Sequence, residues 1–178
     1  MDPLSIIKKY YPENSEIYHV LVDHSRLVAD KALELAARHP ELNPDMNFIE
    51  EAAMLHDIGI FLCNAPEIAC TGSEPYIRHG VLGAEILRKE GLERHALVCE
   101  RHTGSGITRE QIESQQLPLP ARDMLPVSTE EKLICLADKF YSKSHPGKEK
   151  SIEKIRKSMA RFGDDALIRF DEMCRLFL

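Results

Sequence analysis

The run Met54-Leu55-His56-Asp57-Ile58-Gly59 places a histidine and an aspartate side by side at the end of an apolar segment. A neutral imidazole and a carboxylate together offer a divalent transition metal one nitrogen and one oxygen ligand. The glycine that follows allows a helix to stop directly after the pair. A pair of this kind often arises by chance in a chain with eight histidines. It predicts a metal site only if other parts of the chain supply further ligands.

Further candidate ligands are spread along the chain, each in or at the end of a separate predicted helix. His24 lies three residues after Leu21 and three before Leu27, so its side chain points to the apolar face of a helix. A lone histidine there is more often a hydrogen-bonded core residue, and an aspartate beside a lysine can equally belong to a solvated flank. The complete candidate set is His24, His56, Asp57, His79, His102 and Asp138. Helices in a bundle can direct such side chains to one point, which is how all-helical metal sites are built.

Helical spacing of the apolar residues predicts the elements that position these side chains. The predicted helices run from Pro3 to Tyr10, Asn14 to Arg38, Phe48 to Asp57, Tyr76 to Glu90, Ala96 to His102, Ser128 to Phe140, Ile152 to Phe162 and Leu167 to Phe177. No strand-like alternation is present, so the fold class is all-α, a single-domain helical bundle. We expect one domain over residues 1–178, with a core motif region at 15–142 and C-terminal helices at 148–178 packing on it.

Three local features carry further expectations. Gly80 and Gly83 weaken the helix that contains them, so we expect another backbone to approach closely there. Residues 61–75 contain two prolines and a glycine and predict a loop, which is a candidate lid over the site. The remaining histidines are interpreted as surface residues: His19, His39, His95 and His145.

The bulk composition restricts the classes of function. With 178 residues, the chain has the length of one ordinary domain. Its net charge of -6 disfavours a binding surface for duplex nucleic acid or an anionic membrane, because clustered Lys and Arg hold those partners. No apolar run approaches the ~20 residues that cross a bilayer, and five scattered cysteines are typical of thiols in a reducing compartment. We expect a cytoplasmic protein with a small anionic partner, and a homodimer is left open.

The segments around the candidate ligands resemble the HD-domain metal-dependent phosphohydrolases, in the subgroup with the HDIG signature. The matching segments are HSRLVADKALELA from His24, LHDIG at 55–59, RHGVLGAEIL around His79, ERHTGSGI around His102 and EEKLICLADK around Asp138. The resemblance covers residues 15–142, and the ordered series H, HD, H, H, D is far more specific than HD alone. The HGxxGA and LADK segments also look like bacterial enzymes that split dinucleoside tetraphosphates symmetrically. The HTGSGIT and LPLPARDMLP stretches are similar to small HDIG proteins.

The resemblance implies a hydrolase that cleaves a phosphate ester or anhydride of a nucleotide-like substrate with metal-activated water, such as a dinucleoside tetraphosphatase or a nucleotidase. The residues implied as catalytic are Asp57, Asp138 and His56. One divalent metal is implied at His24, His56, Asp57 and Asp138. In dinuclear members a second metal binds at the positions of His79 and His102, with Asp57 as the bridge. Ligand type leaves Fe, Mn, Zn, Co and Ni open, with one or two ions per chain.

One position departs from the family pattern. Many members carry a basic residue directly after the HDIG glycine, where it contacts substrate phosphate, and this chain has Ile60. The candidate substitutes are Arg78, Arg101 and Lys139, with Arg109 and Lys143 as further basic residues near the motifs. Two other interpretations stay open, and the missing cation and the acidic net charge favour the first of them. One is a metal-containing nucleotide-binding or sensing module without turnover, and the other is a structural helical protein with incidental histidines.

Overall fold

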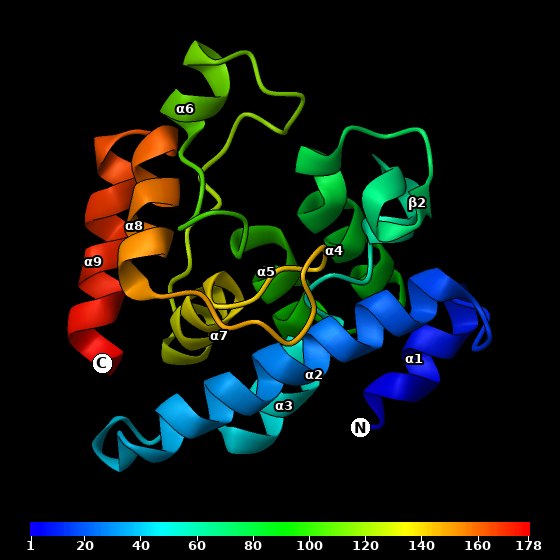
Figure 1. Ribbon diagram of the computed structural model, residues 1–178, viewed down its shortest axis with the longest axis horizontal. Helices are drawn as coiled ribbons and strands as arrows, with labels where there is room; N and C mark the ends of the chain where they lie inside the picture. Colours follow the sequence, from blue (N-terminus) through cyan, green and yellow to red (C-terminus); the bar gives the residue numbers. More distant parts are fainter.

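The computed structural model describes residues 1–178, which fold into a mostly helical domain (Figure 1). The α-helices are α1 (Pro3–Tyr10), α2 (Glu16–Ala37), α3 (Met46–Leu55), α4 (His79–Lys89), α5 (Glu93–Arg101), α6 (Arg109–Ser114), α7 (Thr129–Lys139), α8 (Ile152–Met159) and α9 (Asp164–Phe177). Short 3-10 turns lie at Pro40–Leu42, Ile60–Leu62, Pro66–Ile68, Tyr76–Arg78 and Ala160–Phe162. The predicted all-α, single-domain class is confirmed, and none of the helices combines the length and apolarity needed to span a bilayer.

The predicted loop at residues 61–75 contains the β-structure of the chain. Strands β1 (Asn64–Ala65) and β2 (Cys70–Thr71) pair antiparallel, and each is two residues long. Such short strands carry no alternating pattern, so periodicity cannot reveal them. Together with the turn at Pro66–Ile68 they give this segment a fixed shape beside α4, on the right of Figure 1.

The long helix α2 crosses the lower face of the molecule in Figure 1 and packs on α3 and α7, while α4 packs on α5. Helices α2, α3, α5 and α7 share one apolar core. At the left of Figure 1, α8 and α9 lie side by side, and α9 contacts α7. Phe170, Met173 and Phe177 of α9 are buried in the same core. The C-terminal helices are thereby held at a fixed place beside α7.

Side-chain caps fix where the helices of the site begin. The Asp45 carboxylate accepts a hydrogen bond from the Phe48 amide at 3.1 Å at the start of α3. The Ser128 hydroxyl accepts one from the Glu131 amide at 3.1 Å at the start of α7. Each cap satisfies an amide that has no partner within its helix. The starting residue then sets which later residues face the interior.

The third helix ends at Leu55, one residue before the His-Asp pair, and not after it as the sequence indicates. Gly59 has a right-handed φ of -84°, so it does not end the helix in a left-handed conformation. It allows close packing instead: a Cβ at this position would lie 2.3 Å from the His79 carbonyl oxygen and 2.4 Å from the Gly83 amide nitrogen. The expected helix stop is therefore wrong, and the glycine serves the contact between this turn and α4.

The expected close approach at the glycines of α4 is confirmed. A Cβ on Gly80 would lie 2.6 Å from the Cys99 carbonyl oxygen, and one on Gly83 would lie 2.4 Å from the Cys99 sulfur. These separations are well below van der Waals contact. The two glycines thus allow α4 to press against α5, which brings the start of α4 close to the end of α5.

His95 is buried, so its interpretation as a surface residue is wrong. The helix begins at Glu93 and not near residue 96, which places His95 within α5 on the side that packs against α3. Its ring stands edge-on to Phe48 at a centroid distance of 4.9 Å, and its Nε2 lies 3.2 Å from a Glu51 oxygen. Of the other three, His19 and His145 are exposed and His39 is partly exposed.

Candidate metal centre

Six candidate ligands from five helices meet at one buried place. His24 comes from α2, the pair His56 and Asp57 follows α3, His79 begins α4, His102 follows α5 and Asp138 lies near the end of α7. Their ligand atoms form two groups in which all atoms lie within 4.8 Å of one another. The groups are His24, His56, Asp57 and Asp138, and Asp57, His79 and His102. Asp57 belongs to both.

The two oxygens of the buried Asp57 carboxylate face different groups. Its Oδ2 lies 3.3 Å from His24 Nε2 and 3.0 Å from His56 Nε2. Its Oδ1 lies 3.4 Å from His79 Nε2 and also 3.4 Å from His102 Nε2. A carboxylate in this position can give one oxygen to each of two metal ions.

Backbone hydrogen bonds orient three of the four imidazoles. The Nδ1 atoms of His56, His79 and His102 lie 2.6 Å, 2.7 Å and 2.7 Å from the carbonyl oxygens of Ala53, Tyr76 and Cys99, respectively. A carbonyl oxygen can only accept, so Nδ1 carries the proton in the neutral imidazole and Nε2 presents a lone pair. The Nε2 atoms of His79 and His102 are 3.1 Å apart. Two lone pairs at that distance repel each other unless a cation lies beside both.

Several of the atoms at this place lack hydrogen-bond partners. His56 Nε2 and both Asp57 oxygens are buried and form no hydrogen bond, although other ligand atoms surround them. Burying a carboxylate is costly, and the Lys143 ammonium at Oδ2 leaves Oδ1 of Asp57 with imidazole neighbours alone. Imidazole nitrogens together with carboxylate oxygens are a donor set for divalent transition metals. The cluster therefore fits a divalent metal site of the kind expected from the sequence.

The charges around the cluster and its burial shift the pKa values of three of its side chains. Burial alone would raise the pKa of Asp57, but protonated His56 and Lys143 hold that pKa well below its usual range. Burial lowers the pKa of His79 to about 3, so this imidazole is neutral. Burial also lowers the pKa of His56, but the neighbouring carboxylates of Asp57 and Asp138 outweigh it and raise the pKa to about 9. A metal bound at His56 would displace this proton.

Two lysines contact the cluster. The Lys139 ammonium lies 2.6 Å from Asp138 Oδ2 and donates to the His102 carbonyl oxygen at 3.1 Å, so it links α7 to the end of α5. The Lys143 ammonium lies 2.5 Å from Asp57 Oδ2. Lys143 stands in the irregular segment after α7, where no sequence pattern singles out one residue. Of the basic residues considered from the sequence, Lys139 and Lys143 thus contact the cluster, whereas Arg78 and Arg101 pair with other carboxylates.

Arg78 and Arg101 are engaged elsewhere. The Arg101 guanidinium lies 2.9 Å from a Glu131 oxygen, and Arg78 forms an ion pair with Glu74. Neither arginine is among the residues that line the pocket beside the cluster, whereas Lys139 is. Their assignment as substrate contacts stays a prediction.

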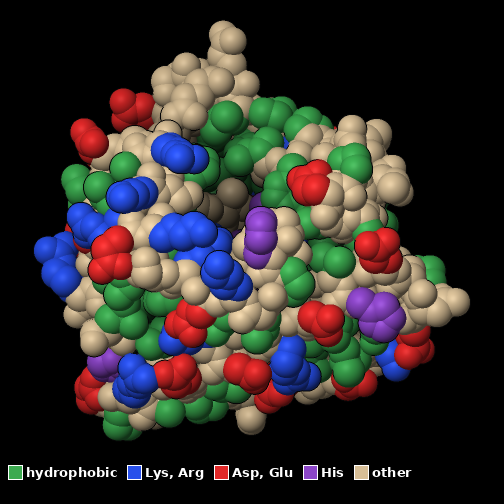
Figure 2. Space-filling model, in the orientation of Figure 1, with side chains coloured by type: hydrophobic (Ala, Val, Ile, Leu, Met, Phe, Trp, Pro, Cys, Tyr) green, Lys and Arg blue, Asp and Glu red, His purple; other side chains and the backbone are tan.

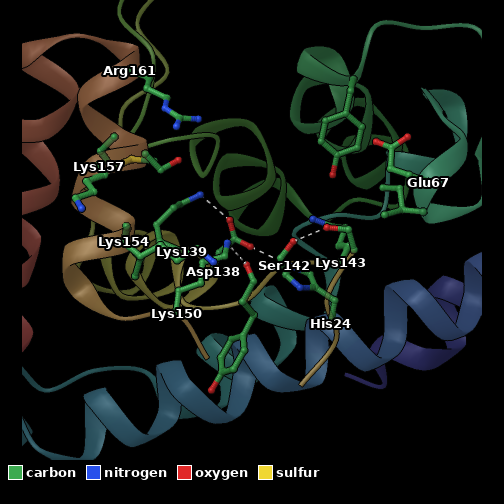
Figure 3. A pocket seen from close by; sticks show the side chains of 17 residues that line it. His24, Glu67, Asp138, Lys139, Ser142, Lys143, Lys150, Lys154, Lys157 and Arg161 are labelled. Atoms are coloured by element: carbon green, nitrogen blue, oxygen red, sulfur yellow. Dashed lines mark hydrogen bonds and ion pairs between the residues drawn. The ribbon is translucent and has the colours of Figure 1, made fainter. Parts of the chain in front are cut away.

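A pocket with a volume of about 540 Å³ opens beside the cluster and reaches His24 and Asp138 (Figure 3). This volume lies in the range of small-molecule sites. Glu67 and Ile68 of the segment at 61–75 line one side, which agrees with its interpretation as a candidate lid. The basic residues of the lining are Lys139, Lys143, Lys150, Lys154, Lys157 and Arg161.

Comparison with known proteins matches the part of the chain that contains all six candidate ligands. The HD domain family matches residues 21–142 of the chain. An uncharacterized protein of Methanocaldococcus jannaschii is 38% identical over 138 residues, which cover 76% of this chain and 70% of that protein. No solved structure matches this chain.

Two longer proteins match as well. The tRNA (cytidine(56)-2'-O)-methyltransferases of Picrophilus torridus and Thermoplasma volcanium are 33% and 32% identical over 144 and 123 residues. These matches cover 75% and 68% of this chain but 38% and 32% of the two methyltransferases. The chain thus corresponds to about a third of each of them.

Proposed function

This chain belongs to the HD domain family, and from that premise we propose that it is a metal-dependent phosphohydrolase acting on a small phosphate-containing substrate. The observation that carries the proposal is the Asp57 carboxylate, which is buried and lies between two groups of imidazoles, with the Lys143 ammonium at Oδ2 as its one lysine or arginine partner. Such a carboxylate can give one oxygen to each of two metal ions.

We assign a first metal to His24, His56, Asp57 and Asp138 and a second to Asp57, His79 and His102. Divalent metals held there would supply a nucleophilic water at neutral pH and neutralise charge on phosphoryl oxygens. The protein itself orients the ligands: the carbonyls of Ala53, Tyr76 and Cys99 hold three imidazole rings, and Lys139 holds Asp138.

The substrate enters through the pocket that reaches His24 and Asp138. A phosphate there lies beside the cluster and near the ammonium of Lys143, which is free to turn to a phosphate oxygen once a metal neutralises Asp57. The pocket is the size of a nucleotide site. We therefore propose a nucleotide or a related phosphate ester or anhydride as substrate.

The methyl transfer named for the two longer relatives is not part of this proposal. The family that matches this chain is the HD domain, and the chain corresponds to 38% and 32% of those proteins. Their names link the matched region to proteins that act on tRNA, so RNA ends belong in the substrate panel below.

Turnover tests the function. Protein loaded with Mn²⁺ or Fe²⁺ should release phosphate or a nucleotide from at least one of nucleoside mono-, di- and triphosphates, dinucleoside tetraphosphates, cyclic dinucleotides or a short RNA with a terminal phosphate. His56→Ala should abolish that activity, while His39→Ala, which changes a histidine between α2 and the turn at Pro40–Leu42, should keep it. Silence across the whole panel with fully loaded protein contradicts the proposal. Tight binding of a nucleotide that stays intact would support the alternative, a metal-containing nucleotide-binding module without turnover.

Metal content tests the dinuclear assignment separately. Wild-type protein should hold close to two ions per chain, and the double variant His79→Ala/His102→Ala should hold about one, because the first group of ligands is intact. A wild-type content of one ion that the double variant retains would rule out the second site and leave a mononuclear centre.

A further inference from the structure

The pocket beside the metal centre has one strongly basic wall. Lys154 and Lys157 lie in α8, and Arg161 lies in the 3-10 turn that continues it. Their spacing of three and four residues places them on one face of the helix, and Lys150 precedes that face by four residues. Figure 2, in the orientation of Figure 1, shows Lys and Arg side chains gathered between a hollow and the position of α8. Figure 3 labels all four among the side chains that line the pocket.

These cations lack the partners that most other basic side chains have. Lys154, Lys157 and Arg161 form no ion pair, whereas Arg156 on the other side of α8 pairs with Asp171 of α9. The other arginines and lysines that pair with a carboxylate include Lys8, Lys9, Arg26, Lys31, Arg38, Arg78, Arg88, Arg94, Arg101, Arg109 and Arg122. Three cations without a carboxylate partner therefore lie together on the pocket side of α8 and of the turn that continues it.

The pocket does not contain enough acid to balance this wall. Its carboxylates are Glu67 and Asp138, and Lys139 already pairs with Asp138. Lys150 donates to the Tyr141 carbonyl oxygen at 2.9 Å, which leaves its charge uncompensated. Burial, together with the neighbouring cations Lys139, Lys154 and Lys143, lowers the pKa of Lys150 despite the opposing effect of Asp138. An anion is the ligand that such a surface favours.

We propose that Lys154, Lys157 and Arg161 form a second anion site, which holds phosphate groups that extend away from the phosphate at the metal centre. The proposal rests on the proposed function and defines its substrate class: a small molecule with a chain of two or more phosphates. From Lys154 to Arg161 the chain rises by about 10 Å at 1.5 Å per residue, which is enough for more than one linked phosphate. This stretch lies outside residues 21–142, which match the family, so the site is an addition to the shared metal centre.

A small polyphosphorylated molecule fits better than a nucleic-acid strand. The pocket has a volume of about 540 Å³, which suits a nucleotide. The net charge of the chain is -6, and a long strand would extend past the basic wall onto acidic surface. The side chains concerned are exposed, so their substitution leaves the core untouched.

Binding at a fixed free Mn²⁺ concentration tests the second anion site. ATP and AMP are titrated into metal-loaded wild-type protein, into Lys154→Ala/Lys157→Ala and into the control Lys89→Ala/Arg175→Ala, by isothermal titration calorimetry. The control removes two exposed, unpaired charges on α4 and α9. The Lys154→Ala/Lys157→Ala variant should weaken ATP binding by about tenfold, since two exposed charge contacts are lost, and should change AMP binding by less than about twofold. Arg161→Ala should weaken ATP binding further.

Other results would overturn it. If Lys154→Ala/Lys157→Ala weakens ATP and AMP binding equally, or weakens neither, then α8 does not bind the additional phosphates of ATP. If a single-stranded RNA binds more tightly than ATP and loses more affinity in the variant, the ligand of this site is a nucleic-acid strand and not a small molecule. Failure of the proposed function would look different. If the wild-type protein hydrolyses none of the substrates, but Lys154→Ala/Lys157→Ala still binds ATP more weakly than the wild type, the proposed function is wrong and the second anion site is supported.

Discussion

Replacing Gly59 with alanine tests the contact between the turn after α3 and the start of α4, on which the shape of the cluster depends. The added Cβ would lie 2.3 Å from the His79 carbonyl oxygen, 2.4 Å from the Gly83 nitrogen and 2.9 Å from the Gly83 Cα. All three are backbone atoms, so no side-chain rotation relieves the overlap. Ordinary contact needs roughly 3.5 Å, so α4 must move by about 1 Å relative to the turn.

The cost follows from general magnitudes. Overpacking a well-packed site costs typically about 1–3 kcal/mol, and three backbone overlaps place Gly59→Ala at the upper end, near ~3 kcal/mol. For a chain of this length, each kcal/mol shifts the Tm by about 2–4 °C, so the Tm should fall by about 6–12 °C. The shift also moves His79 away from Asp57, which should lower the content of the second metal.

Calorimetric unfolding and metal analysis measure both effects, with Gly91→Ala as the matched control. Gly91 has a φ of +76° and no heavy atom within 4 Å of its would-be Cβ. Its substitution costs the left-handed backbone strain alone, roughly 1–2 kcal/mol, and should leave the metal content unchanged. A Gly59→Ala protein with the Tm of the wild type and its full metal content would refute the reasoning.

Three further predictions concern the metal, a lysine and a buried histidine. Removing the metal with a chelator should lower the Tm by about 8–16 °C, because an ion at 1,000 times its Kd adds about 4 kcal/mol; an unchanged Tm would mean that the cluster binds no ion tightly. Lys143→Gln should raise metal affinity by about tenfold in a titration, since the ammonium competes for Asp57 Oδ2; unchanged or weaker binding would contradict that competition. Burial against Phe48 lowers the pKa of His95, so the stability that neutral His95 contributes is present above the unfolded pKa near 6.5 and is lost as the pH falls through the lowered folded pKa. In chelated protein, the unfolding free energy should therefore differ less between pH 8 and pH 5 in His95→Gln than in the wild type, and an equal difference would count against this assignment.

Much of the helical framework could be predicted because its signals are local. Apolar spacing and caps mark helix starts, and Thr108 with Gln111 forms both bonds of a capping box at the start of α6. His24 and Asp138 are 114 residues apart in the sequence but lie in contact. Their contact could be predicted only from the ordered series of motifs, because no local pattern indicates which distant helices pack together. The sequence predicts the end of α3 at Asp57, two residues later than the observed end at Leu55. A glycine that permits close packing cannot be distinguished in the sequence from one that ends a helix.

The partners of charged side chains could not be predicted. Arg101 stands beside His102 in the sequence, but its guanidinium turns to Glu131, 30 residues further on. Spacing alone also leaves Lys154 and Lys157 as an ordinary solvated helix face. What distinguishes them is the packing of α9 on α7, which sets α8 beside the pocket, and that packing is a long-range property.

The same packing explains how this chain manages without a basic residue after its HDIG motif. Ile60 is fully buried in the apolar core. A lysine or arginine at this position would have its stem in the core and would need a path for its charge to reach the pocket. Positive charge for a phosphate must then come from another part of the fold. The segment after α7 supplies it at the cluster through Lys143, and α8 supplies it further out through Lys154 and Lys157. In the proposed function, the part of the chain that matches the family would thus provide the metal ligands, and the C-terminal part would provide most of the positive charge that contacts the substrate.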